Sequence, residues 1–218
     1  SILEWGSGRA KTVTGISGGS LQALPNTESK QGGWNVRVDQ LVLNSSNETL
    51  TTDLIGSVGA NGDALINTVK PVQIDPFLLL LPLLMDDTSE EEIRGLNPKG
   101  ELATLQIQLH NGQPSLAAKV LDLQWDKTDK VPGLSSLNAE LFWYKNNGAI
   151  YLESKNSVLS ADGVIKKDIH INQLKSRFYI YPEQVDEAKK QWIVKGSDML
   201  LDSDAVTLNP QFKLNTTT

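Results

Sequence analysis

The chain has 218 residues, of which 39% are hydrophobic and 21% are charged, and its formal net charge is −6. An acidic chain without a basic cluster gains nothing from the release of phosphate counterions, which argues against nucleic-acid binding. The absence of cysteine excludes disulfide frameworks, thiolate metal sites and cysteine nucleophiles. We expect residues 1–218 to form a single β-rich segment of a longer protein, because β structures often extend to this length.

The first clear strand begins at Trp34, and its sequence returns near the end of the chain. Residues 34–50 read WNVRVDQLVLNSSNETL, and residues 192–208 read WIVKGSDMLLDSDAVTL. Strands are built from a small number of residue types, so such matches also arise by chance. A true repeat would place two equivalent units at about residues 17–50 and 175–208. Repeated supersecondary units favour an extended, stackable architecture over a closed globule.

A helical insertion is predicted at about residues 76–95. Asp75-Pro76 supplies an N-cap and a proline at the first helical position. The apolar run Phe77–Met85 that follows is too short for the roughly 20 residues of a bilayer span, so no membrane span is predicted. The acidic stretch from Thr88 ends at Gly95, which is typical of a second short helix.

The central part of the chain alternates apolar and polar residues with a period of two, which predicts strands with one buried face. We expect Leu105, Ile107 and Leu109 to share one face of such a strand. The same pattern predicts shared faces in two further strands, and the turn at residues 146–148 predicts a hairpin. The expected faces of these strands are Ala117, Leu121, Leu123 and Trp125, and then Leu137, Ala139, Leu141 and Trp143.

No residue pattern indicates catalysis. The two histidines, His110 and His170, have no ligand companions at metal-site spacing, and no nucleophile signature such as G-x-S-x-G is present. The acidic cluster at residues 86–92 is typical of a solvated helix start. We therefore expect no enzyme activity, no metal and no cofactor.

The stretch Leu96–Leu152 resembles the YhdP family, the very large AsmA-like proteins of Gram-negative bacteria. The motifs that carry the resemblance are Pro98 with Gly100 opening a strand, a strand ending at Trp125, the turn at residues 132–134 and the Asn147-Gly148 turn. The strands led by Trp34 and Trp192 are similar to the recurring hairpins of that family.

The resemblance implies a long, curved antiparallel sheet with an apolar groove. It also implies a periplasmic location, an inner-membrane anchor elsewhere in the protein, and a part in moving phospholipid to the outer membrane and maintaining its barrier. The expected partners are a phospholipid or another acyl-chain ligand and the rest of the same chain. The candidate groove residues are Phe77, Leu80, Leu84, Leu105, Ile107, Leu109, Leu121, Leu123, Trp125, Leu141 and Trp143.

Other interpretations stay open from the sequence. The same apolar faces would also suit the closed core of a β-sandwich that binds carbohydrate or acts in adhesion through its five tryptophans. A purely structural spacer is a third interpretation. The alternatives differ in whether the apolar face is open or closed, and in whether Trp125 and Trp143 line a furrow or form an exposed platform.

Overall fold

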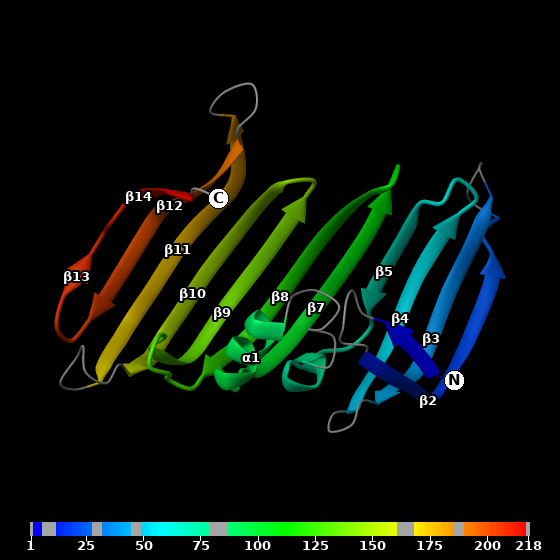
Figure 1. The fold of residues 1–218 in the computed structure, drawn as a ribbon, viewed down its shortest axis with the longest axis horizontal. Helices are drawn as coiled ribbons and strands as arrows, with labels where there is room; N and C mark the ends of the chain where they lie inside the picture. Colours follow the sequence, from blue (N-terminus) through cyan, green and yellow to red (C-terminus); the bar gives the residue numbers. More distant parts are fainter. Residues whose placement is uncertain are drawn as a thin grey trace.

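The computed structural model describes residues 2–5, 12–27, 32–44, 49–78, 87–160, 168–184 and 190–216. These residues form one 14-stranded sheet in which all paired strands are antiparallel (Figure 1). The strand order is β1-β2-β3-β4-β5-β7-β8-β9-β10-β11-β12-β13, with β6 paired to β7 and β14 paired to β12. The predicted mainly-β class with an extended, curved antiparallel sheet is confirmed.

The strands are long, and most neighbours in sequence are neighbours in the sheet. Their bounds are β1 Ile2–Trp5, β2 Thr12–Pro25, β3 Gly33–Asn44, β4 Thr49–Gly59, β5 Ala64–Thr68, β6 Val72–Gln73, β7 Lys99–His110, β8 Gln113–Trp125, β9 Gly133–Tyr144, β10 Asn147–Ser160, β11 Ile169–Gln184, β12 Lys190–Ser203, β13 Thr207–Leu208 and β14 Phe212–Thr216. Hairpin connections keep the topology simple, because consecutive antiparallel strands need only short turns.

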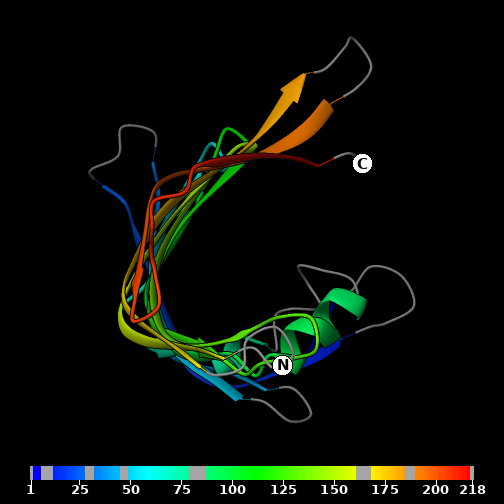
Figure 2. The same cartoon turned by 90° about the vertical axis from the view of Figure 1, so that its left-hand side faces the viewer.

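The strands bend along their length, so that the sheet has the outline of a letter C when viewed along its long axis (Figure 2). Five residues within strands have a left-handed backbone, with φ between 49° and 56°. The register shifts beside several of them, for example between Val38 and Leu41 and between Val120 and Leu123. A β-bulge bends its strand and increases its twist, so this series of bulges accounts for the curvature. The five residues are Gln40, Asp122, Ser136, Asn156 and Asp198.

Few apolar side chains are fully buried. Leu134, Leu137 and Ile171 form a buried cluster near one end of the strands, with half-buried neighbours packed around it. The other buried apolar side chains among the described residues are Leu50, Leu102 and Ile193. A sandwich closes its core between two packed sheets, whereas the described strands form one sheet, so the sandwich fold is wrong for this chain.

The predicted insertion is helical where it is described. Residues 75–78 form a 3₁₀ turn, and α1 runs from Asp87 to Gly95. Residues 79–86, which include most of the apolar run, lie outside the described residues. The prediction of one or two short helices is therefore confirmed for the second part of the insertion, where α1 lies.

The two segments that echo each other in sequence form equivalent hairpins. The echo aligns Gln40 with Asp198, and both residues are left-handed bulge positions. The equivalent cross-strand pairs are Pro25–Trp34 with Pro182–Trp192 and Leu43–Leu50 with Leu201–Leu208, and the hydrogen bond from Thr49 to Asn44 (2.9 Å) matches that from Thr207 to Asp202 (2.6 Å). The repeat units 17–50 and 175–208 stay a prediction that these correspondences favour.

Candidate functional site

One face of the curved sheet is apolar along its whole width, and we call it the inner face. A rung of directly paired residues crosses the sheet from β2 to β12 and on to β14, with one residue from every strand except β1, β6 and β13. Every residue in this first rung is apolar or glycine: Ala23, Val36, Gly56, Ile66, Ile107, Leu116, Trp143, Gly148, Ile180, Val194 and Leu214.

A second rung of the inner face lies two residues further along each strand. Thr68 is its single polar member, and its hydroxyl accepts a hydrogen bond of 3.0 Å from the backbone N–H of Leu105. The Thr68 hydroxyl is therefore used within the ladder between β5 and β7. The second rung consists of Leu21, Val38, Leu54, Thr68, Leu105, Ala118, Leu141, Ile150, Phe178, Gly196 and Phe212.

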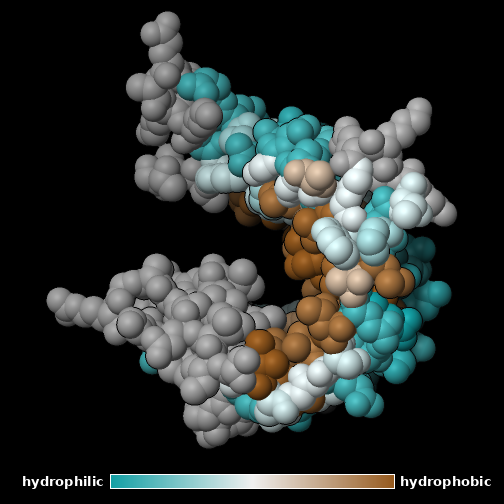
Figure 3. Space-filling view, turned by 90° about the vertical axis from the view of Figure 1, so that its right-hand side faces the viewer, coloured by the Kyte–Doolittle hydropathy of each residue, from teal (hydrophilic) through white to brown (hydrophobic). Residues whose placement is uncertain are grey.

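The inner face lines an open hollow. Figure 3 shows hydrophobic side chains gathered on the inside of the C and hydrophilic ones on its outside. Ile66 is 44% exposed and Ile107 is 43% exposed, although both lie in the middle of the sheet. Side chains of this kind in a closed core are fully covered. The inner face therefore presents exposed apolar side chains on the concave side of the sheet.

The opposite face, which we call the outer face, carries the charged residues. Lys119 and Glu140 form an ion pair of 3.1 Å between neighbouring strands, and Arg177 pairs with Asp198 at 3.1 Å. The outer rung that alternates with the first inner rung contains Gln22, Arg37, Ile55, Asn67, Gln106, Ala117, Phe142, Ala149, Tyr179, Lys195 and Lys213. The sheet thus separates an inner surface whose two rungs hold no charged residue from an outer surface that mixes charged, polar and apolar residues.

Most of the groove residues predicted from the sequence lie on the inner face. Leu105, Ile107, Leu109, Leu141 and Trp143 share the inner face. Leu123 and Trp125 are also on the inner face, where they pack against the buried cluster. Phe77 is half-buried in the 3₁₀ turn, and Leu80 and Leu84 lie outside the described residues.

Leu121 is an exception, and its predicted place is wrong. It pairs with Glu101 and lies beside Lys119 and Glu140 on the outer face. The bulge at Asp122, whose φ is 50°, adds one residue to β8 and reverses the alternation from that point. For the same reason Ala117 lies on the outer face while Leu123 lies on the inner face, so the two do not share a face as expected.

Aromatic rings contact one another on the inner face in the C-terminal half of the sheet. Trp143 contacts Trp192, with ring centroids 6.1 Å apart and an interplanar angle of 34°. The Trp143 ring lies over Gly148, where an added Cβ would come within 2.6 Å of the ring. Because glycine has no side chain, Gly148 leaves space for the Trp143 indole on the inner face. Trp125 and Trp143 are half-buried, so these two do not form the exposed platform that the carbohydrate-binding interpretation requires.

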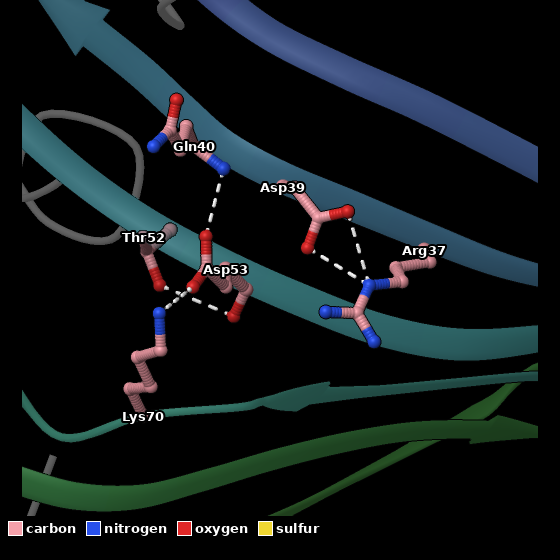
Figure 4. Close-up of polar contacts among 6 residues, drawn as sticks. All are labelled: Arg37, Asp39, Gln40, Thr52, Asp53 and Lys70. Atoms are coloured by element: carbon pink, nitrogen blue, oxygen red, sulfur yellow. Dashed lines mark hydrogen bonds and ion pairs between the residues drawn. The ribbon is translucent and has the colours of Figure 1, made fainter.

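The bulge in β3 is held by a carboxylate on the neighbouring strand (Figure 4). Asp53 accepts a hydrogen bond of 2.7 Å from the backbone N–H of Gln40, and its other carboxylate oxygen lies 2.7 Å from the Lys70 ammonium. The hydrogen bond with Lys70, followed by that from Gln40, lowers the pKa of Asp53. Asn138 plays the same part at the β8 bulge, where it accepts from the backbone N–H of Asp122 at 3.0 Å.

The histidines are structural or exposed. His110 Nδ1 lies 2.7 Å from Asp63, which also accepts the backbone N–H of Asn111 at 2.8 Å. The Asn111 N–H is the main reason that the pKa of Asp63 is lowered. These contacts join two turns at the same end of neighbouring strands. His170 lies at the other end of the strands, so the fold does not bring the two histidines together.

The acidic cluster is likewise explained by local structure. Glu90 pairs with Arg94 one turn along α1 at 2.7 Å, and Glu92 pairs with Lys130 at 2.7 Å. Within the described part of the chain, no group of three or more His, Asp or Glu side chains could hold a metal ion. None of the helices formed by the described residues is long and apolar enough to cross a membrane.

The whole described sheet falls within one family. No curated protein matches the chain, and no solved structure matches it. The family model described as YhdP protein matches residues 2–218. The YhdP family is associated with the Gram-negative cell envelope and is not a known enzyme family. Because the match extends over nearly every residue, the chain belongs to the YhdP family.

Proposed function

We propose that the inner face binds the acyl chains of phospholipids and that this segment forms part of a non-enzymatic, periplasmic route for phospholipid to the outer membrane. The observation that carries the proposal is the pair of apolar rungs, which cross the sheet without a charged residue while many of their side chains stay exposed. An exposed apolar surface of this extent marks a binding site for an apolar partner.

Acyl chains suit the chemistry of the groove. The groove offers rows of aliphatic and aromatic side chains and little polar recognition, so its contacts are non-directional. Each methylene that leaves water contributes about 0.8 kcal/mol. A ligand held in this way can move along the groove, because equivalent contacts repeat from strand to strand.

The length of the groove also favours a conduit over a single binding pocket. Neighbouring strands lie about 4.8 Å apart, so the rungs from β2 to β14 extend over roughly 50 Å. One leaflet of a bilayer contributes about 15 Å of hydrocarbon thickness. The groove is therefore several acyl chains long. The charged head groups would remain outside the apolar wall, since the rungs contain no charged partner for them.

Two matched substitutions test the proposal. Ile66 on the inner face and Ile55 on the outer face are the same residue with nearly equal exposure, 44% and 41%. Phospholipid that co-purifies under mild conditions is measured by mass spectrometry of an organic extract. We expect Ile66→Glu to lower the bound lipid about tenfold, because losing contact with two methylenes costs about 1.6 kcal/mol.

The control is Ile55→Glu, which we expect to leave the amount of lipid unchanged. Circular dichroism of both variants shows that the sheet is retained. A lipid-free extract of the unsubstituted protein, or an equal loss of lipid in both variants, would count against the proposal.

A further inference from the structure

The pairing between neighbouring strands is much shorter at one place in the sheet than elsewhere. β5 has five residues, whereas its neighbours β4 and β7 have 11 and 12 (Figure 1). β5 pairs with β7 through four residues of each strand, Ala64–Asn67 with Gln106–Leu109, and we call these residues the junction. Along the strand order from β2 to β12, every strand pair that does not involve β5 joins eight to twelve residues. The junction is therefore the narrowest crossing between β2 and β12.

The two parts of the sheet separate beyond the junction. After β5 the chain makes one more backbone hydrogen bond to β4, of 2.9 Å from the N–H of Val69 to the carbonyl of Asp53, and β6 then pairs with β7 instead. The Thr49–Thr52 part of β4 pairs with β3 and, among the described strands, with no other. Among the described residues, a backbone ladder thus links β1–β5 to β6–β14 only at the junction.

Side-chain packing adds little at the junction. Ile66 and Ile107 pair across it on the inner face, and they are 44% and 43% exposed. Elsewhere side chains on neighbouring strands support the ladder, as in the contact of Trp143 with Trp192 and in the buried cluster around Leu137. A region with few buried apolar contacts opens at a low cost in free energy. The sheet is therefore least supported where it is also narrowest.

Polar side chains link the two ends of the junction. Asp63, just before β5, lies 2.7 Å from His110 Nδ1 and accepts the backbone N–H of Asn111 at 2.8 Å. At the other end, the Thr68 hydroxyl accepts the backbone N–H of Leu105 at 3.0 Å. A contact with an exposed side chain such as His110 contributes little to stability, because water screens it. These links fix the register of the junction but bury no apolar surface across it.

We propose that the junction is a hinge, about which β1–β5 and β6–β14 rotate as two rigid parts. Fewer backbone hydrogen bonds oppose the twisting of a four-residue ladder than that of a ladder of eight to twelve. The axis lies along β5 and β7, so the rotation changes the angle between the two parts of the inner face. On the basis of the proposed function, this rotation opens the inner face for an acyl chain to enter.

Distances between pairs of spin labels test the hinge in the absence of lipid. The chain has no cysteine, so labels attach only at introduced positions. Arg37, Ala117 and Lys195 lie on one outer rung, and Ala117 is four strand intervals, or about 19 Å, from each of the other two. Arg37→Cys with Ala117→Cys spans the junction, and Ala117→Cys with Lys195→Cys is the matched control within β6–β14.

Double electron–electron resonance gives the distribution of distances for each pair. We expect the distribution to be at least about twofold wider for the pair that spans the junction, because hinge rotation adds to the motion of the labels. Hydrogen exchange measured by mass spectrometry should also be at least about tenfold faster in β5 than in β10, since short and exposed ladders open more often.

A reversible crosslink tests what the hinge does for lipid entry. Leu65 and Gln108 pair directly on the outer side of the junction, at the Cα spacing of about 4.5–5.5 Å that a disulfide can bridge. We expect Leu65→Cys with Gln108→Cys to slow the uptake of fluorescent phosphatidylethanolamine from phosphatidylcholine vesicles about tenfold, and a reductant to restore it. The control crosslink, Lys119→Cys with Glu140→Cys between β8 and β9, should leave uptake unchanged.

The outcomes separate the hinge from the proposed function. Equal widths for the two spin-label pairs would overturn the hinge, whether or not the protein binds lipid. Equal uptake with the junction crosslinked and reduced would overturn its part in lipid entry. A folded protein that takes up no phospholipid would count against the proposed function, and the distance distributions would still decide whether the junction is a hinge.

Discussion

The two faces of the sheet alternate along the same strands but differ in chemistry and in exposure. On the inner face, both rungs lack a charged residue from β2 to β14, and side chains such as Ile107 stay exposed. On the outer face, ion pairs such as Lys119–Glu140 join neighbouring strands. In an ordinary antiparallel sheet the apolar face is covered by other parts of the fold. Among the described residues no second sheet covers the inner face, and we propose that acyl chains complete its burial.

The largest expected difference between the two faces is in how far a substitution lowers the free energy of unfolding. Leu137 lies in the buried cluster and is 4% exposed, so Leu137→Ala should lower the free energy of unfolding by about 2–5 kcal/mol. Glu140→Ala, on the outer face of the same strand, removes an exposed ion pair and should cost no more than about 1 kcal/mol. Denaturant unfolding measures both. Equal costs would show that the two faces do not differ as described.

A smaller effect is expected at the glycine beneath the inner aromatic wall. Gly148→Ala would place a Cβ within 2.6 Å of the Trp143 ring, so the indole must move away from Trp192. We expect a loss of about 1–3 kcal/mol and a change in tryptophan emission. Ala149→Ser, the next residue on the outer face, should stay within about 0.5 kcal/mol. Retained emission in Gly148→Ala would contradict the packing of the indole on glycine.

The pH dependence of stability tests the bulge that bends β3. Asp53 has a lowered pKa in the folded protein, so its carboxylate stabilises the fold above its ordinary pKa of 3.8. This contribution is lost as the pH falls through the lowered value. Asp53→Asn should therefore be less stable than the unsubstituted protein at pH 7, and the gap should close under acid conditions. Unfolding curves of both proteins are measured between pH 7 and pH 2. A difference in stability that stayed constant over this range would contradict the prediction.

The sequence predicted the faces of regular strands well. In β9, the alternation from Leu137 to Trp143 is uninterrupted, because the extra residue at the register shift beside Leu137 lies on β8, so the pattern translates directly into the inner face. The place of Leu121 was predicted wrongly, because the bulge at Asp122 depends on backbone conformation and on the hydrogen bond to Asn138. The alternation of apolar and polar residues predicts neither the backbone conformation of Asp122 nor its hydrogen bond with Asn138.

Other features of the site could be predicted only with the register of the sheet known. Ile66 and Ile107 become neighbours on the inner face only because β5 pairs with β7, although the helical insertion separates these strands in the sequence. The two exposed aromatic residues on the outer face had a signal in the sequence, since Phe142 and Tyr144 occupy positions that alternation assigns to the polar face of β9. Two aromatic residues on a polar face indicate a contact surface.

The most direct test of the central claim compares photocrosslinking from adjacent residues of β7. A benzophenone amino acid is placed at Ile107, which faces the groove, or at Gln108, which faces outward, and both side chains are exposed. The protein is irradiated with phospholipid vesicles, and adducts are identified by mass spectrometry. The account predicts phospholipid adducts from position 107 and essentially none from position 108. Equal labelling at both positions, or labelling only from position 108, would contradict an acyl-chain groove on the inner face.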